Sequence, residues 1–170
     1  MENNTKPYVK RITYVALFVA IISVLAQISI PTPIMPLTLQ IFAVALCGFV
    51  LNKKYSVITV IVYLLLGTVG VPVFANLKGG FYILISYTGG FLWGFIPFVF
   101  LCSVSKGKSA IPLSILGLIL CYILGITQYY IISQTSVWYI FLPPLLKDII
   151  LVIAAYFVAT RVNKIIKKHL

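Results

Sequence analysis

The chain has 170 residues, of which 62% are hydrophobic and 9% are charged, and its mean hydropathy is +1.13. This composition is typical of integral membrane proteins and leaves no room for a separate soluble domain. A formal net charge of +11 is also found in nucleic-acid-binding proteins, but here the basic residues form short clusters between long apolar segments. The charge pattern therefore excludes a nucleic-acid partner and indicates a protein in a lipid bilayer.

Six membrane-spanning helices are predicted, because about 20 apolar residues cross a bilayer core of about 30 Å. They are placed at about 11–30, 37–51, 55–71, 87–104, 110–132 and 143–167. The first is too long for the apolar core of a signal peptide, and more spans follow, so it is expected to be retained. The second is short for a complete crossing. An open sheet cannot satisfy its backbone in lipid, so the prediction is a single all-α integral membrane domain over residues 1–170.

The basic residues predict the orientation of these helices. All Lys and Arg residues except Lys78 and Lys147 lie near the two termini or in the connections 52–54 and 105–109. Because positively charged loops remain in the cytoplasm, both termini are expected there. The outer side then comprises the loop 31–36, the connection 72–86 and the segment 133–141.

Asp148 is the only acidic residue after Glu2, and it lies in an apolar segment. A carboxylate at the centre of a membrane helix costs about 2.5–3.5 kcal/mol on insertion scales, so such residues usually have a function. In the helix at 143–167, Asp148 lies about 7–8 Å from the outer end and is accessible from outside. The alternative is a structural hydrogen bond. Side chains of neighbouring helical residues diverge by about 100°, so Lys147 is expected to contact another helix or extend outward rather than pair with Asp148.

The outer connection at 72–86 is longer than a turn needs, and long ordered loops are usually functional. Gly79 and Gly80 permit a positive φ and a close backbone approach. Asn76 both donates and accepts hydrogen bonds, and Lys78 is the only cation of the outer loops, able to attract an anionic ligand. Thr88 is expected to cap the fourth helix. The alternatives are a loop that simply closes the protein and a solvated Lys78.

Two further features allow two interpretations each. Gln40, in the outer part of the second helix, has four hydrogen-bonding sites that either a ligand or a neighbouring helix would satisfy. Ala16 and Ala20 form a small-xxx-small pattern on the first helix, which lets another helix approach closely. That helix belongs either to this chain or to a partner subunit.

No nucleotide-binding or hydrolase motif occurs in the chain. The three cysteines, Cys47, Cys102 and Cys121, are not spaced as metal or redox ligands, and the only histidine is His169. We therefore expect no catalytic residue, no metal site and no cofactor. The cysteines are interpreted as small apolar packing residues.

The most distinctive segments are residues 31–40 (PTPIMPLTLQ), 66–75 (LGTVGVPVFA) followed by Gly79-Gly80, 88–94 (TGGFLWG), and 141–143 (FLP) before Asp148. Together they resemble the BioY family, the biotin-specific S components of energy-coupling-factor (ECF) transporters, over nearly the whole chain. Two positions depart from the family pattern. Leu151 occupies the place of a lysine that many members have three residues after the acid, and Tyr87 replaces the usual proline.

The resemblance implies a compact S-component bundle in a prokaryotic cell membrane. Such a subunit captures extracellular biotin, has no catalytic activity, and docks on an ECF transmembrane coupling subunit and two ATPase subunits. It implies that Asn76 and Asp148 bind biotin and that Ala16 and Ala20 face the partner, while Lys147 is at best a substitute for the missing lysine. The candidate site is completed by Gln40, Tyr82, Tyr87, Thr88, Gly79 and Gly80. An S component for another vitamin and a structural membrane protein without a ligand remain alternatives.

Overall fold

The protein is described from a computed structural model that covers residues 5–30, 32, 36–105, 107–135 and 138–168, without the side chains of residues 5–8, 108 and 166–168. Several residues discussed above lie outside this description. They are Glu2, residues 31 and 33–35 of the Pro-rich loop, Lys106, residues 136–137 of the last outer segment, and His169.

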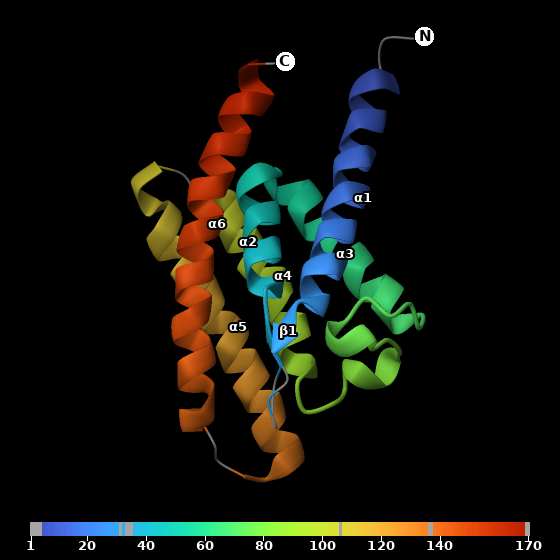
Figure 1. The fold of residues 1–170 in the computed structure, drawn as a ribbon, viewed down its shortest axis with the longest axis vertical. Coiled ribbons are helices and arrows are strands. Elements are labelled where there is room, and N and C mark those ends of the chain that lie inside the picture. Colours follow the sequence, from blue (N-terminus) through green and yellow to red (C-terminus); the bar gives the residue numbers. More distant parts are fainter. Residues whose placement is uncertain (1–4, 31, 33–35, 106, 136–137, 169–170) are drawn as a thin grey trace.

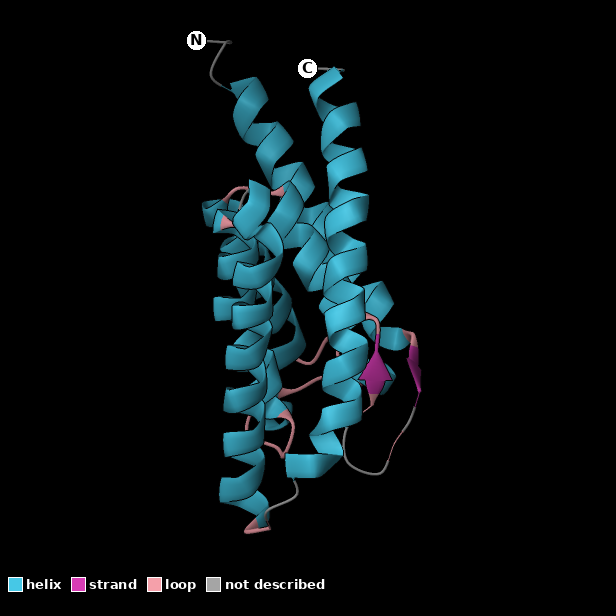
Figure 2. Cartoon of the chain, turned by 90° about the vertical axis from the view of Figure 1, so that its left-hand side faces the viewer, coloured by secondary structure: helices cyan, strands magenta, loops and turns pink. Residues whose placement is uncertain are grey.

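The described residues form six α-helices, as predicted, and these lie side by side in one bundle (Figure 1). They are α1 (Thr5–Gln27), α2 (Gln40–Val50), α3 (Lys53–Thr68), α4 (Gly89–Val104), α5 (Ala110–Ser133) and α6 (Leu142–Lys168). Short 3-10 helices lie between them: η1 (Ala75–Leu77), η2 (Phe81–Ile83), η3 (Gly107–Ser109) and η4 (Trp138–Phe141). The first residues of α1 and the last residues of α6 lie at the same end of the bundle (Figures 1 and 2).

The ends of the helices differ from the predicted ends by a few residues, for local reasons. The helix α3 begins earlier because the Asn52 side chain caps it, accepting a hydrogen bond from the Tyr55 backbone N–H at 3.2 Å. It also ends before the predicted residue 71, where Gly70 takes a φ of 108° that favours glycine. At α4, Thr88 holds the N-cap position as predicted, but its side chain makes no capping hydrogen bond.

A short antiparallel hairpin was not predicted. The strands β1 (Ser29–Ile30) and β2 (Leu37–Thr38) pair with Ser29 opposite Thr38, and they follow α1 and precede α2 in the chain. Figure 2 shows the two strands in magenta. The all-α fold class holds, and the hairpin takes the last residues of the segment predicted as the first helix, which ends at Gln27 rather than at about residue 30. The argument from lipid excludes open sheets only where the backbone faces the hydrocarbon.

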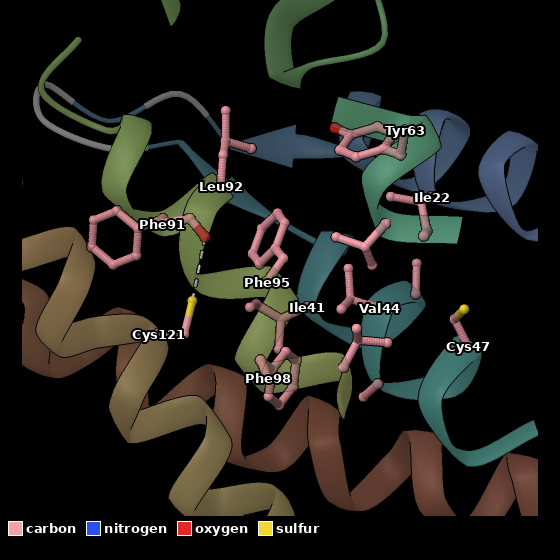
Figure 3. Close-up of a cluster of buried hydrophobic side chains, with 14 of the residues drawn as sticks. Ile22, Ile41, Val44, Cys47, Tyr63, Phe91, Leu92, Phe95, Phe98 and Cys121 are labelled. Atoms are coloured by element: carbon pink, nitrogen blue, oxygen red, sulfur yellow. Dashed lines mark hydrogen bonds between the residues drawn. The ribbon is translucent and has the colours of Figure 1, made fainter. Parts of the chain in front are cut away.

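The short helix α2 is the centre of the bundle. It contacts α1, α3, α4 and α6, and seven of its eleven residues are buried. Its 11 residues span about 16 Å, roughly half of a bilayer core, which confirms that this helix is too short for a complete crossing. Ile41 and Val44 of α2 pack between Ile22 of α1 and Phe95 of α4 (Figure 3).

Helices α4 and α5 approach each other closely through small residues. A Cβ added at Gly94 would lie 2.7 Å from the Cys121 Cα, and one added at Gly90 would meet the Leu124 carbonyl. The Cys121 thiol lies against the Phe91 carbonyl at 3.4 Å (Figure 3). All three cysteines are buried and free, as expected for packing residues.

Three segments of the described chain are long and apolar enough to cross a membrane: Val9–Gln27, Ala110–Ser133 and Trp138–Ile165. Large apolar side chains such as Val24, Ile150 and Phe157 are more than half exposed on their outer surfaces. This arrangement suits helices whose outer faces contact lipid rather than water.

Candidate functional site

A cavity of about 300 Å³ lies at the end of the bundle opposite the termini. Its walls come from six parts of the chain: β2, the start of α2, the connection between α3 and α4, the first half of α4, α5 and the start of α6. The apolar wall is formed by Ile41, Phe74, Phe91, Leu92 and Phe95. A mostly apolar cavity with a few converging polar groups is the usual form of a small-molecule site.

The predicted site residues meet in this cavity, with two exceptions. Its lining includes Gln40, Asn76, Tyr82, Tyr87, Thr88, Lys147 and Asp148. Gly79 and Gly80 are not part of the wall. They shape the loop instead, because the Gly80 N–H donates to the Gly67 carbonyl at 2.6 Å and a Cβ at Gly79 would lie 2.5 Å from the Val71 carbonyl.

Asp148 is 3% exposed and is held from two sides. The Tyr122 hydroxyl of α5 donates to Asp148 Oδ2 at 2.7 Å. On the other side Lys147 Nζ lies 2.8 Å from Oδ1 and also donates to the Thr38 carbonyl at 2.8 Å. The contact at Oδ1 is an ion pair without hydrogen-bond geometry, so Oδ1 accepts no hydrogen bond from the described residues. Asp148 is therefore a buried carboxylate in the cavity wall whose Oδ1 contacts the described residues only through the Lys147 ion pair.

The expectation that Lys147 does not pair with Asp148 was wrong. Adjacent side chains leave a helix at different angles, but the lysine side chain is long enough to curve back, and the Thr38 carbonyl fixes its ammonium group near the carboxylate. The expected contact of Lys147 with another element is confirmed, since Thr38 belongs to β2. Lys147 therefore joins the hairpin to α6 at the edge of the cavity.

Asn76 is exposed on η1 and has left-handed backbone angles, φ 61° and ψ 37°. Asparagine tolerates this conformation better than most residues. Its Oδ1 accepts a hydrogen bond from the Ser29 hydroxyl at 2.8 Å. Gln27 at the end of α1 holds the same segment, because it donates to the Val73 and Phe74 carbonyls and accepts from the Leu77 N–H at 2.8 Å. The Asn76 amide N–H groups are thereby left for other partners.

Gln40 is 5% exposed, and the structure shows a partner for it within the protein. Its amide donates to the Tyr63 hydroxyl at 2.8 Å, and that hydroxyl donates to the Val73 carbonyl at 3.1 Å. A neighbouring helix thus satisfies one end of the side chain, while Gln40 also lines the cavity. Tyr82 and Tyr87 lie at the cavity mouth and are 60% and 50% exposed.

Sequence reasoning missed Tyr122 and Gln27. Both are polar groups within apolar helices, and a buried tyrosine hydroxyl or glutamine amide requires a partner. That requirement is the signal that could have identified Tyr122 and Gln27 as residues that build the site. It does not indicate which partner each side chain takes. It also missed Phe91 and Phe95, because phenylalanines in a membrane helix do not reveal which of them face a cavity.

The family model described as the BioY family matches residues 1–168. The chain belongs to the BioY family. The biotin transporter BioY of Thermotoga maritima is 38% identical over 157 residues, covering 88% of this chain and 93% of its own length. A probable biotin transporter BioY of Pyrococcus horikoshii is 40% identical over 116 residues, covering 68% of this chain and 72% of its own.

A solved structure has the same fold. It is the crystal structure at 2.1 Å of the S-component for biotin from an ECF-type ABC transporter. The likeness has a TM-score of 0.83 at 25% sequence identity and covers 96% of this chain and 95% of the other. The predicted six-helix S-component bundle is confirmed, and the chain is a multi-pass membrane protein of a transporter family rather than an enzyme.

Ala16 and Ala20, the predicted docking residues, are both exposed on α1. Neither packs into the bundle, which removes the interpretation that their spacing serves an intramolecular helix contact. Their role toward a partner stays a prediction.

Proposed function

We propose that this chain is the substrate-binding subunit for biotin in an ECF-type transporter. The proposal depends on one observation above all: a chain of the BioY family holds a cavity into which a buried carboxylate oxygen, an amide and two lysines converge. Biotin has two ureido N–H donors, a ureido carbonyl, an apolar bicyclic ring and a carboxylate tail. Each of these groups has a complement in the cavity.

In this proposal Asp148 Oδ1 accepts a ureido N–H, because Asp148 lines the cavity and this oxygen is engaged by the described residues only through the Lys147 ion pair. Asn76 donates to the ureido carbonyl, since Ser29 already occupies its Oδ1. The ring lies against the apolar wall of Phe91 and Phe95. Lys78 at the exposed rim attracts the carboxylate tail.

The cavity opens toward the outside of the cell in this proposal. The described basic side chains Lys10, Arg11, Lys53, Lys54, Arg161 and Lys164 belong to the end of the bundle that carries the termini. The positive-inside rule favours that end in the cytoplasm of a prokaryotic cell membrane. Biotin therefore enters from outside, and its binding energy shifts the 72–86 connection toward a closed state.

Import needs partner subunits, because the sequence has no nucleotide-binding motif. We assign docking on an ECF transmembrane coupling subunit, which works with ATPase subunits, to the α1 face that carries Ala16 and Ala20. Small residues there allow a partner helix to approach closely. The subunit itself needs no cofactor.

The test is mass spectrometry of the ligand that copurifies with the protein, followed by thermal unfolding with a panel of vitamins. We expect biotin alone to copurify and to raise the unfolding temperature. Stabilisation by a different vitamin and not by biotin refutes the biotin assignment. Asp148→Asn and Asn76→Ala test the site, and wild-type biotin affinity in both would refute the residue assignment while leaving the family membership intact.

A further inference from the structure

A second cleft lies at the end of the bundle that carries the termini. Its volume is about 160 Å³, and it forms where the first part of α1, the end of α2, the start of α3 and the last part of α6 meet. Its polar lining consists of Arg11, Tyr14, Asn52, Tyr55 and Asn163. A cavity volume of about 10–15 Å³ is enough for one water molecule, so the cleft has room for a group considerably larger than water.

Arg11 is fixed at the wall of this cleft. Its Cζ lies 5.6 Å from the centroid of the Tyr55 ring, and its Nη1 donates to the Tyr55 hydroxyl at 3.4 Å. The cation–π contact orients the guanidinium but leaves most of its five N–H donors unused by the described residues. Such a group is suited to bind an oxyanion with two parallel hydrogen bonds.

The protein has no acid to neutralise Arg11 within its described part. The chain contains only two acidic residues, and Asp148 is at the other end of the bundle, paired with Lys147. Lys10 and Lys53 add positive charge nearby in the sequence. The resulting field around the cleft favours a bound anion from outside the chain.

Two asparagines complete the donor set. Asn52 uses its Oδ1 to cap α3, accepting from the Tyr55 N–H at 3.2 Å, and so keeps its NH₂ group for another acceptor. Asn163 anchors the last part of α6 to the rest of the wall, because its amide donates to the Phe49 carbonyl at 3.1 Å. The cleft therefore combines exposed donors, Arg11 of α1 and the α3 cap Asn52, with the half-buried Asn163 of α6, and each of the three is tied to a neighbour by a hydrogen bond.

We propose that this cleft binds a phosphate group, carried either by an anionic phospholipid or by a free phosphate. A guanidinium held over an aromatic ring, beside amide donors and in a positive field, is complementary to phosphate oxygens. Basic clefts between membrane helices at the headgroup level commonly bind anionic lipids. Nothing in this site overlaps the biotin cavity, and the proposal does not depend on the identity of the vitamin.

The test uses the full chain purified in a zwitterionic detergent. Native mass spectrometry measures retention of added phosphatidylglycerol against phosphatidylcholine, and thermal unfolding measures the effect of inorganic phosphate against chloride at equal ionic strength. The variants are Arg11→Gln and Arg11→Lys. The matched control is Lys10→Gln, which removes one charge from the same helix but does not line the cleft.

We expect the protein to bind phosphatidylglycerol in preference to phosphatidylcholine. The affinity for phosphatidylglycerol should fall about tenfold in Arg11→Gln, as for the loss of a charge-assisted hydrogen bond, and by less than about twofold in Lys10→Gln. Arg11→Lys should lie between, because lysine keeps the charge but not the paired donors. If inorganic phosphate protects the protein with the same variant pattern, the source is a free phosphate and the site still stands. Equal losses in Arg11→Gln and Lys10→Gln, or no preference for either anion, would overturn the proposal. So would an Arg11→Gln defect confined to assembly with a partner protein.

Discussion

Tyr122 is expected to hold the Asp148 carboxylate in position, and Tyr122→Phe tests this directly. The substitution keeps the ring, which packs edge-on against Phe91 at 5.3 Å, and removes only the hydroxyl that donates to Asp148 Oδ2 at 2.7 Å. Both partners are nearly fully buried, with Tyr122 4% and Asp148 3% exposed. The substitution therefore leaves Oδ2 without a hydrogen-bond donor from the described residues.

The magnitude follows from the charge of the acceptor. A hydrogen bond to a charged group is worth about 1.5–3 kcal/mol. For a chain of this size each kcal/mol moves the unfolding temperature by about 2–4 °C, which gives a decrease of about 3–12 °C for Tyr122→Phe. Without this bond the carboxylate can rotate, so Oδ1 is no longer fixed in the wall. We expect the Kd for biotin to rise about tenfold, equivalent to about 1.4 kcal/mol.

The assay is thermal unfolding of the purified ligand-free protein together with calorimetric titration of biotin. Tyr129→Phe is the matched control, because Tyr129 lies on the same helix and packs against Phe141, but its hydroxyl makes no hydrogen bond to the described residues. We expect the control to behave as wild type. If Tyr122→Phe shows the unfolding temperature and biotin affinity of the control, the carboxylate does not depend on this hydroxyl and the reasoning is refuted.

Three further substitutions test the supports of the cavity. Lys147→Met should lower the free energy of unfolding by about 1–2 kcal/mol in chemical denaturation and should weaken biotin binding. The effect is limited because the Lys147 side chain is about one-third exposed. Unchanged stability and affinity would contradict the bridging role of Lys147. Gln27→Leu removes the acceptor of the Leu77 N–H, so hydrogen exchange of that amide should become faster, and an unchanged rate would contradict the anchor. Gly89→Ala should cost about 1–3 kcal/mol because its Cβ would meet the Leu84 backbone. At Gly117 the nearest atom to an added Cβ is Leu101 Cβ at 3.1 Å, a milder contact, so Gly117→Ala should cost less, and equal costs would exclude the steric explanation.

The helices could be predicted from the sequence because lipid imposes one simple requirement on each. A spanning segment must be apolar and about 20 residues long, and α5 and α6 satisfy this plainly. The ends of α1 and α3 depended instead on local contacts, such as the Asn52 cap and the pairing of Ser29 with Thr38. These contacts involve two or three atoms each and leave no periodic pattern in the sequence.

The candidate site was predictable to the extent that polar residues are rare in this chain. Polar side chains are costly in an apolar membrane protein, which made Asp148, Asn76 and Gln40 candidates. All three line the cavity. The connections between them were not predictable. Lys147 reaches the Thr38 carbonyl across 109 residues of sequence, and a backbone carbonyl carries no residue-specific signal.

The polar contacts that build the cavity are also the contacts that hold its walls together. Tyr122 joins α5 to α6 through Asp148, and Lys147 joins α6 to β2 through the Thr38 carbonyl. On the opposite wall, Gln40 connects α2 through the Tyr63 hydroxyl to the loop after α3. Because these groups are shared, a substitution that breaks one of them should change folding stability and biotin affinity together. A substitution of a residue at the exposed rim, such as Lys78, should change biotin affinity without changing folding stability. This difference in effect distinguishes the wall of the cavity from its entrance.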